Sequence, residues 1–393
     1  MPRWKGWKGW KGLLLILVLS LVAVLPGVRT TTAAPEEWNK LAPHDNQGKK
    51  YRLAYVETDP FFNYAGTFYY LVKGLERLGW ITSTEGMPFS PSQEDSKVMW
   101  DWLADRDMGP NIEFVKDAHY SLISMPPDGA DQIMDRLNTQ KDIDLMIVMG
   151  TSPGQKLAND RHHVPTMVFS SSNAVQSGII QSETDSGLDH VWAHMDLTRY
   201  KRQVQVFHDI FQFKKLGMVY ENSELGRIYA AVDDVRDVAA ERGFELVELH
   251  VDEPKSPDDR ARYNLEVQEA FRKLSTQVDA VYLTAGKWDQ AKLSLLLEPL
   301  YAQKVPVFSQ LGSGEVARGA LLSLYRANFS GIGYFGAENM VQALNGTPLR
   351  KLPQIFGDTP SIVMNLEVAN RIGYKTPFDI LLAADEIYTS IKK

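Results

Sequence analysis

The chain has no cysteine among its 393 residues. This absence excludes disulfides, thiolate metal sites and a cysteine nucleophile. It also excludes attachment to a membrane through a lipidated N-terminal cysteine, so we do not expect a lipoprotein.

The sequence also lacks a cluster of Lys and Arg outside its first residues. The formal net charge is -7. Residues 1–33 contribute five positive charges and no acids, so the remainder would carry -12. An acidic chain without a basic cluster does not fit a nucleic acid partner.

No apolar run is long enough to cross a bilayer. The run Leu13–Leu25 has 13 residues, whereas a transmembrane helix needs about 20. A basic Trp-Lys-Gly repeat precedes this run, and Thr31 and Ala33 supply small residues at a plausible cleavage site. This order is typical of a secretory signal. We therefore predict a signal peptide over 1–33, cleaved near Ala33, and a polar leader over 34–49. An uncleaved anchor stays open as the alternative, because the Trp residues could lengthen the apolar stretch.

Two apolar runs, Leu145–Met149 and Thr166–Phe169, suit strands that are buried on both faces of a parallel sheet. The first run ends in the turn residues 150–153, and the second ends in 170–173. Small molecules bind beyond the carboxyl ends of parallel strands. We therefore expect both turns to lie beside a ligand.

The hydroxyl residues after the first run have a specific predicted role. Thr151 or Ser152 is expected to cap the next helix, with Pro153 in its first turn. Such a cap leaves backbone N–H groups that can bind a carboxylate. The alternative, in which these hydroxyls only cap a helix as in any α/β protein, stays open.

An aromatic loop follows the first predicted strand, Tyr51–Val56, and precedes a helix over 65–78. Because Phe61, Phe62 and Tyr64 follow the carboxyl end of that strand, they can lie over a ligand. They can equally hold the loop against the core.

A second series of strands and helices begins with Leu216–Tyr220. Further strands are predicted over 279–283 and 305–308, and helices over 226–242, 262–276 and 289–302. Two series of similar size predict an α/β protein with two doubly wound, Rossmann-like lobes that face each other across a cleft.

The C-terminal part of the chain, from Gly312 onward, has small, aliphatic and proline residues at a recognisable spacing. They are Val316, Gly319-Ala320, Ser323, Tyr325, Gly333, Leu344-Asn345-Gly346, Pro348 and Pro353, followed by Ile362-Val363-Met364-Asn365, Ala369, Gly373, Thr376-Pro377, Leu381-Leu382 and Ala384-Asp385-Glu386-Ile387.

This order resembles the substrate-binding proteins of ABC transporters in the tryptophan/tyrosine-type family, a branch of the type I periplasmic-binding-protein fold. The residues 150–153 stand where that family has Gly-Thr-Pro-Ala. Pro165 opens the next strand, and Ser172-Asn173-Ala174, with Gly178 four residues on, stands where the family has Thr-Asp-Pro and Gly. Asn173 thus replaces the usual Asp. The resemblance spans about residues 50–390.

The resemblance implies how the chain is divided and what it does. The N-terminal lobe would take 50–192 and 326–358, and the C-terminal lobe would take 193–325 and 359–393, joined by a hinge that the chain crosses three times. The protein would be a periplasmic monomer that needs no cofactor. It would bind a small molecule and deliver it to an ABC permease in the membrane, without making or breaking a bond.

The predicted ligand contacts are the residues that follow strand ends in both lobes. They are Thr58, Phe61, Phe62, Tyr64, Thr151, Ser152, Ser171, Ser172 and Asn173 in the first lobe, and Tyr220, Glu221, Ala285, Gly286, Lys287 and Gln310 in the second. Hydroxyl groups for a carboxylate, rings for a planar group and Glu221 for an ammonium group fit an amino-acid-like ligand, with an aromatic side chain among the options.

Two other functions stay open. An exported enzyme could pair Ser171 or Ser172 with a histidine, and the candidates are His119, His162, His163, His190 and His194. No Gly-x-Ser-x-Gly motif surrounds these serines, and a metal site would need a third ligand beyond His190 and His194. We therefore predict neither catalytic residues nor a metal. A sensory protein that presents its ligand to a membrane receptor would have the same binding site as a transport protein.

Overall fold

The structure, a computed structural model, describes residues 40–90, 93–254, 256, 259–325, 329–357 and 360–392. The predicted signal peptide, the cleavage site at Ala33 and residues 34–39 of the leader lie outside these ranges. So do the predicted lobe boundaries at 326 and at 358–359. Among the described helices, none combines the length and the apolar character that a bilayer span requires.

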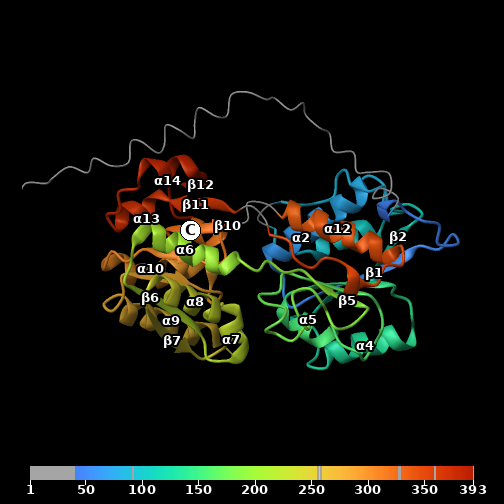
Figure 1. The fold of residues 1–393 in the computed structure, drawn as a ribbon, viewed down its shortest axis with the longest axis horizontal. Coiled ribbons are helices and arrows are strands. Elements are labelled where there is room, and N and C mark those ends of the chain that lie inside the picture. The colour runs from blue at the N-terminus through green and yellow to red at the C-terminus, as the bar shows by residue number, and fades with distance from the viewer. Residues whose placement is uncertain are drawn as a thin grey trace, which may run out of the picture. The chain divides into compact units, whose positions relative to one another are not determined.

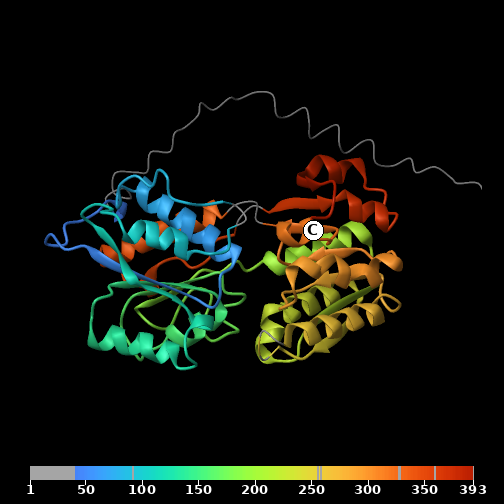
Figure 2. The same ribbon diagram turned by 180° about the vertical axis from the view of Figure 1, so that it is seen from behind.

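The first lobe is built on a parallel five-stranded sheet with the strand order β2-β1-β3-β4-β5 (Figures 1 and 2). The strands are β1 (Tyr51–Glu57), β2 (Ile112–Ser121), β3 (Leu145–Met149), β4 (Thr166–Phe169) and β5 (Val191–Ala193). Every residue of β3 and β4 is buried, as the two unbroken apolar runs predict. β2 is the longest strand of this sheet, with ten residues from Ile112 to Ser121.

Helices cover both faces of this sheet, which explains why its central strands are apolar throughout. On one face, α2 (Phe62–Arg77) packs beside α12 (Ser330–Leu344) (Figure 1). The helix α3 (Lys97–Ala104) contributes Trp100 to the same core. On the other face lie α4 (Gly129–Thr139) and α5 (Thr151–Leu157). Since α12 comes from the far end of the chain, the polypeptide must return to this lobe after building most of the second.

The second lobe contains a seven-stranded sheet with the order β12-β11-β10-β9-β8-β6-β7. Its strands are β6 (Lys215–Glu221), β7 (Glu245–Val251), β8 (Ala280–Leu283), β9 (Val307–Ser309), β10 (Leu322–Tyr325), β11 (Ser361–Asn365) and β12 (Ala384–Tyr388). Only the β10–β11 pair is antiparallel among the described pairings. That reversal follows from the excursion to α12, after which the chain re-enters the sheet with β11. The chain therefore crosses between the lobes three times, and the predicted fold class is confirmed.

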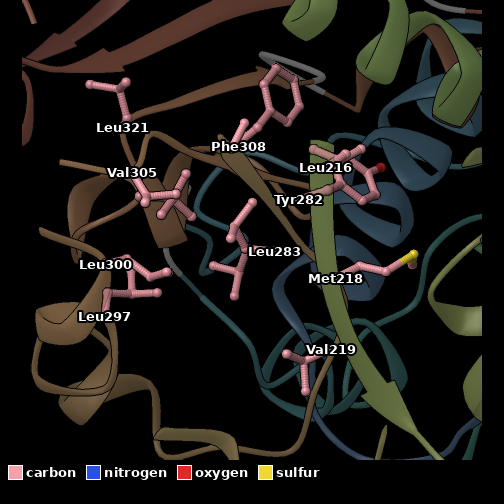
Figure 3. Close-up of a cluster of buried hydrophobic side chains, with 14 of the residues drawn as sticks. Leu216, Met218, Val219, Tyr282, Leu283, Leu297, Leu300, Val305, Phe308 and Leu321 are labelled. Atoms are coloured by element: carbon pink, nitrogen blue, oxygen red, sulfur yellow. The ribbon is translucent and has the colours of Figure 1, made fainter. Parts of the chain in front are cut away.

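Two layers of helices accompany this sheet. They are α6 (Arg199–Phe211), α7 (Glu224–Tyr229), α8 (Val232–Arg242), α9 (Arg260–Leu274), α10 (Leu293–Ala302), α11 (Ser313–Ala317), α13 (Leu366–Arg371) and α14 (Phe378–Ala383). Figure 3 shows part of the core, where side chains of β6, β8 and β9 meet those of α10. Phe308, Tyr282 and Leu297 are fully buried there. This apolar layer fixes the strands whose ends carry the predicted ligand contacts.

The predicted single helix over 226–242 is wrong, because the structure has α7 and α8 separated by Ala230 and Ala231. Ala231 adopts a left-handed conformation with φ of 52°. The carbonyl oxygen of Tyr229 accepts a hydrogen bond from Gln310 Nε2 over 2.9 Å. A side chain distant in sequence therefore takes the acceptor that a continuous helix would have used. The predicted helix over 289–302 likewise begins as a 3-10 turn, Gln290–Lys292, before α10.

Candidate functional site

The carboxyl ends of three neighbouring strands lie level with one another in the first lobe. Glu57 at the end of β1 is in register with Met149 of β3, which is in register with Phe169 of β4. Because the strands are parallel, the turns that follow them emerge at the same edge of the sheet. The structure therefore brings the predicted contacts of the first lobe together.

The turn after β3 differs from the prediction in its helix cap. Gly150, with φ of 99°, is the N-cap of α5, and neither Thr151 nor Ser152 caps the helix. The backbone N–H of Gly150 donates to Phe169 O over 2.9 Å, so the sheet ladder continues through this residue before the helix starts. That sharp change of direction needs a positive φ, which favours glycine. Pro153 does lie in the first turn, as predicted.

The hydroxyl of Thr151 does not cap a helix, contrary to the prediction, but accepts a hydrogen bond from another turn. Its Oγ1 accepts a hydrogen bond from the backbone N–H of Ser172 over 3.0 Å, and the residue is only 3% exposed. The hydroxyl therefore ties the turn after β4 to the turn after β3. Ser152, next to it, is half-buried.

The aromatic loop packs mainly on itself. The rings of Phe61 and Phe62 meet edge to face with centroids 4.7 Å apart, and the ring of Phe61 lies 5.2 Å from that of Tyr64. Phe62 also contacts Phe329 with a centroid separation of 6.4 Å. Burial raises the pKa of the Tyr64 phenol, as does the phenol of Tyr229 on the second lobe, while a hydrogen bond with Thr58 lowers it. These ring contacts thus hold the aromatic loop together.

Gln310 organises the strand ends of the second lobe. Its Oε1 accepts a hydrogen bond from the backbone N–H of Ala285 over 2.7 Å, while its Nε2 donates to Tyr229 O. The residue is 1% exposed. One amide side chain therefore joins the turn after β8 to the C-terminal end of α7.

Glu221, Lys287 and Tyr263 form a second connection in this lobe. The hydroxyl of Tyr263 donates to Glu221 Oε1 over 3.2 Å and accepts from the backbone N–H of Lys287 over 3.2 Å. Burial raises the pKa of Glu221, while the nearby charge of Lys287 lowers it. The ammonium group of Lys287 pairs with Glu253. Gly286 leaves room for the indole ring of Trp288.

Tyr220 points away from the other predicted contacts. Its hydroxyl hydrogen bonds to the carboxylate of Glu248, which also pairs with Arg236 over 2.9 Å. The ring lies against His250, with centroids 4.6 Å apart. This side chain therefore belongs to the packing between β6, β7 and α8.

A cavity of about 280 Å³ lies between residues of both lobes and opens beside a smaller recess. The cavity and the recess share Ser171, Ser172, His194, Asp196 and Tyr200. The recess adds Asn63, Ser170, Arg199, Gln310, Leu311, Leu324 and Phe329, and the cavity adds Asn173, Ala174, Val175, Gln176, Glu183, Met195, Leu197, Lys201 and Asp234. A hydrogen bond of 3.1 Å from Gln176 Nε2 to Asp233 Oδ2 links the two lobes next to it.

We refer to the cavity and the recess together as the hollow. Four of the predicted contacts line it, namely Ser171, Ser172, Asn173 and Gln310. The others surround the lining residues or lie elsewhere on the strand ends. They are Thr58, Phe61, Phe62, Tyr64, Thr151, Ser152, Tyr220, Glu221, Ala285, Gly286 and Lys287.

The sequence interpretation did not name the residues that follow β5 as ligand contacts. Asp196, Arg199 and Tyr200 were missed, and His194 was considered only as a catalytic or metal-binding residue. The rule applied to β1, β3 and β4 also covers them, because β5 is the next parallel strand and they follow its carboxyl end. Since β5 has only three residues, its apolar pattern gives little signal of a strand.

Charges of both signs surround the hollow. Asp196, whose side chain is 9% exposed, lies 3.7 Å from Arg202. Arg199 lies over the ring of Tyr200 with its Cζ 5.0 Å from the centroid. Burial raises the pKa of Asp234, and the charge of Lys201 opposes that shift. The site can therefore accommodate both anionic and cationic groups of a ligand.

The histidines considered for catalysis have other partners. The ring of His119 hydrogen bonds to Ser96, and Nε2 of His194 donates to Phe356 O over 2.9 Å. The buried Oγ of Ser171 has no hydrogen-bond partner among the described residues, so no histidine there activates it. The described ranges contain no group of three acidic or histidine side chains arranged to hold a metal ion.

A comparison with protein families identifies the family of this chain, which the geometry alone does not. Residues 111–388, well over half of the chain, match the family described as ABC transporter substrate binding protein. This chain belongs to that family. Its members bind small molecules outside the cytoplasm, work with ABC permeases and are not an enzyme class. No match was found among curated protein sequences.

Solved structures agree with the family on the fold, which is that of a type I periplasmic binding protein. A conserved domain protein from Vibrio cholerae is similar at a TM-score of 0.63 and 20% identity, with 86% of this chain and 100% of that chain covered. An ABC domain from Streptococcus pneumoniae in complex with L-Trp is similar to this chain at a TM-score of 0.62 and 16% identity, with 86% of this chain and 100% of that chain covered. A ligand-free, open substrate-binding protein with adhesive properties from Clostridium difficile also has a TM-score of 0.62 and this coverage, at 19% identity.

Proposed function

We propose that this protein is the exported solute-binding component of an ABC uptake transporter. It closes its two lobes around a small, amino-acid-like ligand and delivers that ligand to the membrane permease. In this proposal the signal peptide over 1–33 is removed near Ala33, and the mature chain works as a periplasmic monomer without a cofactor. The lobes take 50–192 with 326–358, and 193–325 with 359–393.

The observation that carries the proposal is a hollow lined by strand ends from both lobes. Ser171 and Ser172 follow β4 of the first sheet, and Gln310 follows β9 of the second. A ligand that touches both sets of residues is bound better when the lobes are closed. Binding then shifts the population toward the closed form, and the three connections between the lobes supply the hinge.

The lining residues support an amino-acid-like ligand. Hydroxyl and amide groups come from Ser171, Ser172 and Asn173, and carboxylates come from Asp196 and Asp234. The aromatic loop adjoins the recess through Asn63 and through the Phe62–Phe329 contact. The structurally similar protein from Streptococcus pneumoniae holds L-Trp. Aromatic amino acids are therefore the first ligands to test.

The test is a thermal-shift screen of residues 34–393 with amino acids, sugars, nucleosides and small carboxylates. A ligand at 100 times its dissociation constant should stabilise the fold by about 2.7 kcal/mol. Small-angle scattering with and without the strongest ligand should show a smaller radius of gyration when the ligand is bound.

Two matched variants report on the site. Ser171→Ala removes a hydroxyl that has no hydrogen-bond partner among the described residues, so it should weaken ligand binding without lowering the stability of the free protein. Ser390→Ala, at an exposed position near the C-terminus, should leave both unchanged. The proposal fails if no compound shifts the melting temperature and mass spectrometry finds no small molecule in extracts of the denatured protein.

A further inference from the structure

Arg199 differs from Lys201, the other lysine or arginine residue that lines the hollow. Lys201 pairs with Asp237 over 2.7 Å, and Asp196 lies 3.7 Å from Arg202. Arg199 contacts the ring of Tyr200, and within the described part of the chain it has neither an ion pair nor a hydrogen bond. A half-buried guanidinium group that pairs with none of the described carboxylates retains its capacity to bind an anion.

The recess that Arg199 lines also contains a hydroxyl without a partner. The Oγ of Ser171 is buried from solvent and makes no hydrogen bond to a described residue. Ser170, just before it, has φ of 54°, so the chain turns sharply after β4 and places Ser171 in the recess. A buried hydroxyl without a partner carries a free-energy cost that a bound ligand can remove.

The carboxylate-binding site that the sequence predicts at Thr151 lacks these properties. Thr151 is 3% exposed, its hydroxyl already accepts a hydrogen bond from Ser172, and it does not line the recess. A carboxylate in the recess instead has a guanidinium group on the second lobe and a hydroxyl group on the first.

We propose that Arg199 binds the carboxylate of the transported ligand and that Ser171 donates a hydrogen bond to the same carboxylate. The ligand class is thereby narrowed to small organic carboxylates, amino acids included, and excludes sugars and nucleosides. This inference rests on the proposed function, since it assigns a ligand group within the proposed site. Arginine suits the role because its planar fork binds both oxygens of a carboxylate at once.

Asp196 shares the recess and contributes a negative charge that would oppose an anion. Arg202 lies close enough to offset that charge. For an amino acid ligand, the carboxylate of Asp196 would attract the ammonium group, which is attached to the carbon next to the ligand carboxylate. The recess therefore favours a zwitterion over a plain dianion.

The experiment measures the affinities of matched acid and amide probes by calorimetry. The pairs are L-tryptophan with L-tryptophanamide, L-tyrosine with L-tyrosinamide, and phenylacetate with phenylacetamide. They are measured with the wild-type chain 34–393, with Arg199→Gln and with the control Arg106→Gln. Arg106 also lies over an aromatic ring, that of Trp102 at 4.1 Å, but it is not part of the hollow.

At least one acid should bind the wild type, and its amide should bind far more weakly. Arg199→Gln should weaken binding of that acid by roughly 10- to 100-fold, the range expected for hydrogen bonds to a charged group, and should leave the amide unaffected. Arg106→Gln should bind both probes as the wild type does. Circular dichroism and melting of both variants verify that they are folded.

The inference is overturned if no acid binds, if acid and amide bind equally well, or if Arg199→Gln keeps the affinity for the acid. The proposed function has a separate readout. A sugar or nucleoside that closes the lobes equally in the wild type and in Arg199→Gln would uphold the solute-binding role but overturn both the amino-acid-like ligand and this inference. An acid that binds through Arg199 without reducing the radius of gyration would uphold this inference and contradict the proposed closure of the lobes.

Discussion

The backbone N–H of Ser172 donates a hydrogen bond to the side-chain hydroxyl of Thr151 over 3.0 Å. This bond joins the turn after β4 to the turn after β3, two segments that the sheet alone brings close. Ser172 lines the hollow and Thr151 does not. A residue one layer away from the ligand thus sets the position of a residue beside it.

Thr151→Val should destabilise the fold and weaken ligand binding. The substitution keeps the shape of the side chain but leaves the N–H of Ser172 without its acceptor, which costs about 1 kcal/mol or somewhat more. Denaturant unfolding measures the stability, and calorimetry with the ligand from the screen measures the affinity. Thr151→Ser keeps the hydroxyl and should restore most of both. Equal behaviour of the Val and Ser variants would show that this hydrogen bond does not position the turn.

Gln310→Met should destabilise the second lobe. The variant removes the acceptor of Ala285 N–H and the donor to Tyr229 O at a position that is 1% exposed. Each buried group left unpaired costs about 1–3 kcal/mol. Denaturant unfolding gives the loss of stability, and Gln342→Met is the control. Among the described residues, the side chain of Gln342 donates only to Glu338 O in its own helix, so its replacement should have little effect. A loss of equal size in the two variants would contradict the role assigned to Gln310.

Much of the architecture follows from the sequence, for a physical reason. Strands buried on both faces must be apolar throughout, so an unbroken apolar run such as Leu145–Met149 is recognisable as such a strand from the sequence alone. The same reasoning located the turns that hold Ser171, Ser172 and Asn173. It failed for Arg199 and Tyr200, because a strand of three residues is too short to show a pattern.

The remaining differences arise from contacts between distant parts of the chain. The break between α7 and α8 depends on Gln310, which lies about eighty positions away in sequence. The cap at Gly150 depends on a sheet bond to Phe169. Local propensity favours a continuous helix and a hydroxyl cap at these places, and the tertiary contacts override it.

Two titratable groups in the first lobe, the buried Glu57 and the half-buried His119, should give opposing pH effects on stability. Burial raises the pKa of Glu57 to about 7, although hydrogen bonds from Tyr55 and Ser96 lower it. Burial lowers the pKa of His119 to about 4, and the charge of Lys97 adds to that shift. Ser96 Oγ bridges the two groups, at 2.9 Å from Glu57 Oε2 and 2.8 Å from His119 Nε2.

The signs follow from which state binds more protons. Between its ordinary pKa of 4.5 and about 7, Glu57 is protonated in the folded state and ionised in the unfolded state. Stability therefore falls as pH rises, by up to about 1.4 kcal/mol per pH unit. Between about 4 and its ordinary 6.5, His119 is neutral when folded and charged when unfolded. Its contribution therefore increases with pH, and the two effects partly cancel in the wild type.

Glu57→Gln and His119→Gln should separate these contributions. Relative to the wild type, Glu57→Gln should gain stability more steeply as the pH is raised between 4.5 and 6.5. His119→Gln should lose stability over the same range. The measurement is denaturant unfolding at several pH values, and its readout is the slope, so a uniform loss from changed packing does not affect it. Parallel pH curves for both variants and the wild type would show that neither group titrates with a shifted pKa.

Gly333→Ala should loosen the return of the chain to the first lobe. A Cβ at this position of α12 would lie 2.6 Å from the carbonyl carbon of Tyr70 and 2.7 Å from the backbone nitrogen of Leu71, both in α2. Backbone atoms cannot move aside as the end of a flexible side chain can. The two helices would have to separate, at a cost of about 1–3 kcal/mol.

Gly314→Ala is the control for this substitution, because its Cβ would meet only the end of Arg318 at 3.4 Å. Its stability should stay within about 1 kcal/mol of the wild type, since alanine favours a helix. If the two variants unfold alike, α12 is not packed as tightly on α2 as the structure shows. If only Gly333→Ala loses stability, the contact of α12 with α2 stabilises the first lobe directly. A segment placed between β10 and β11 of the second sheet then belongs energetically to the first lobe. Any closure of the lobes must consequently bend the chain on both sides of α12 and leave the α2–α12 contact intact.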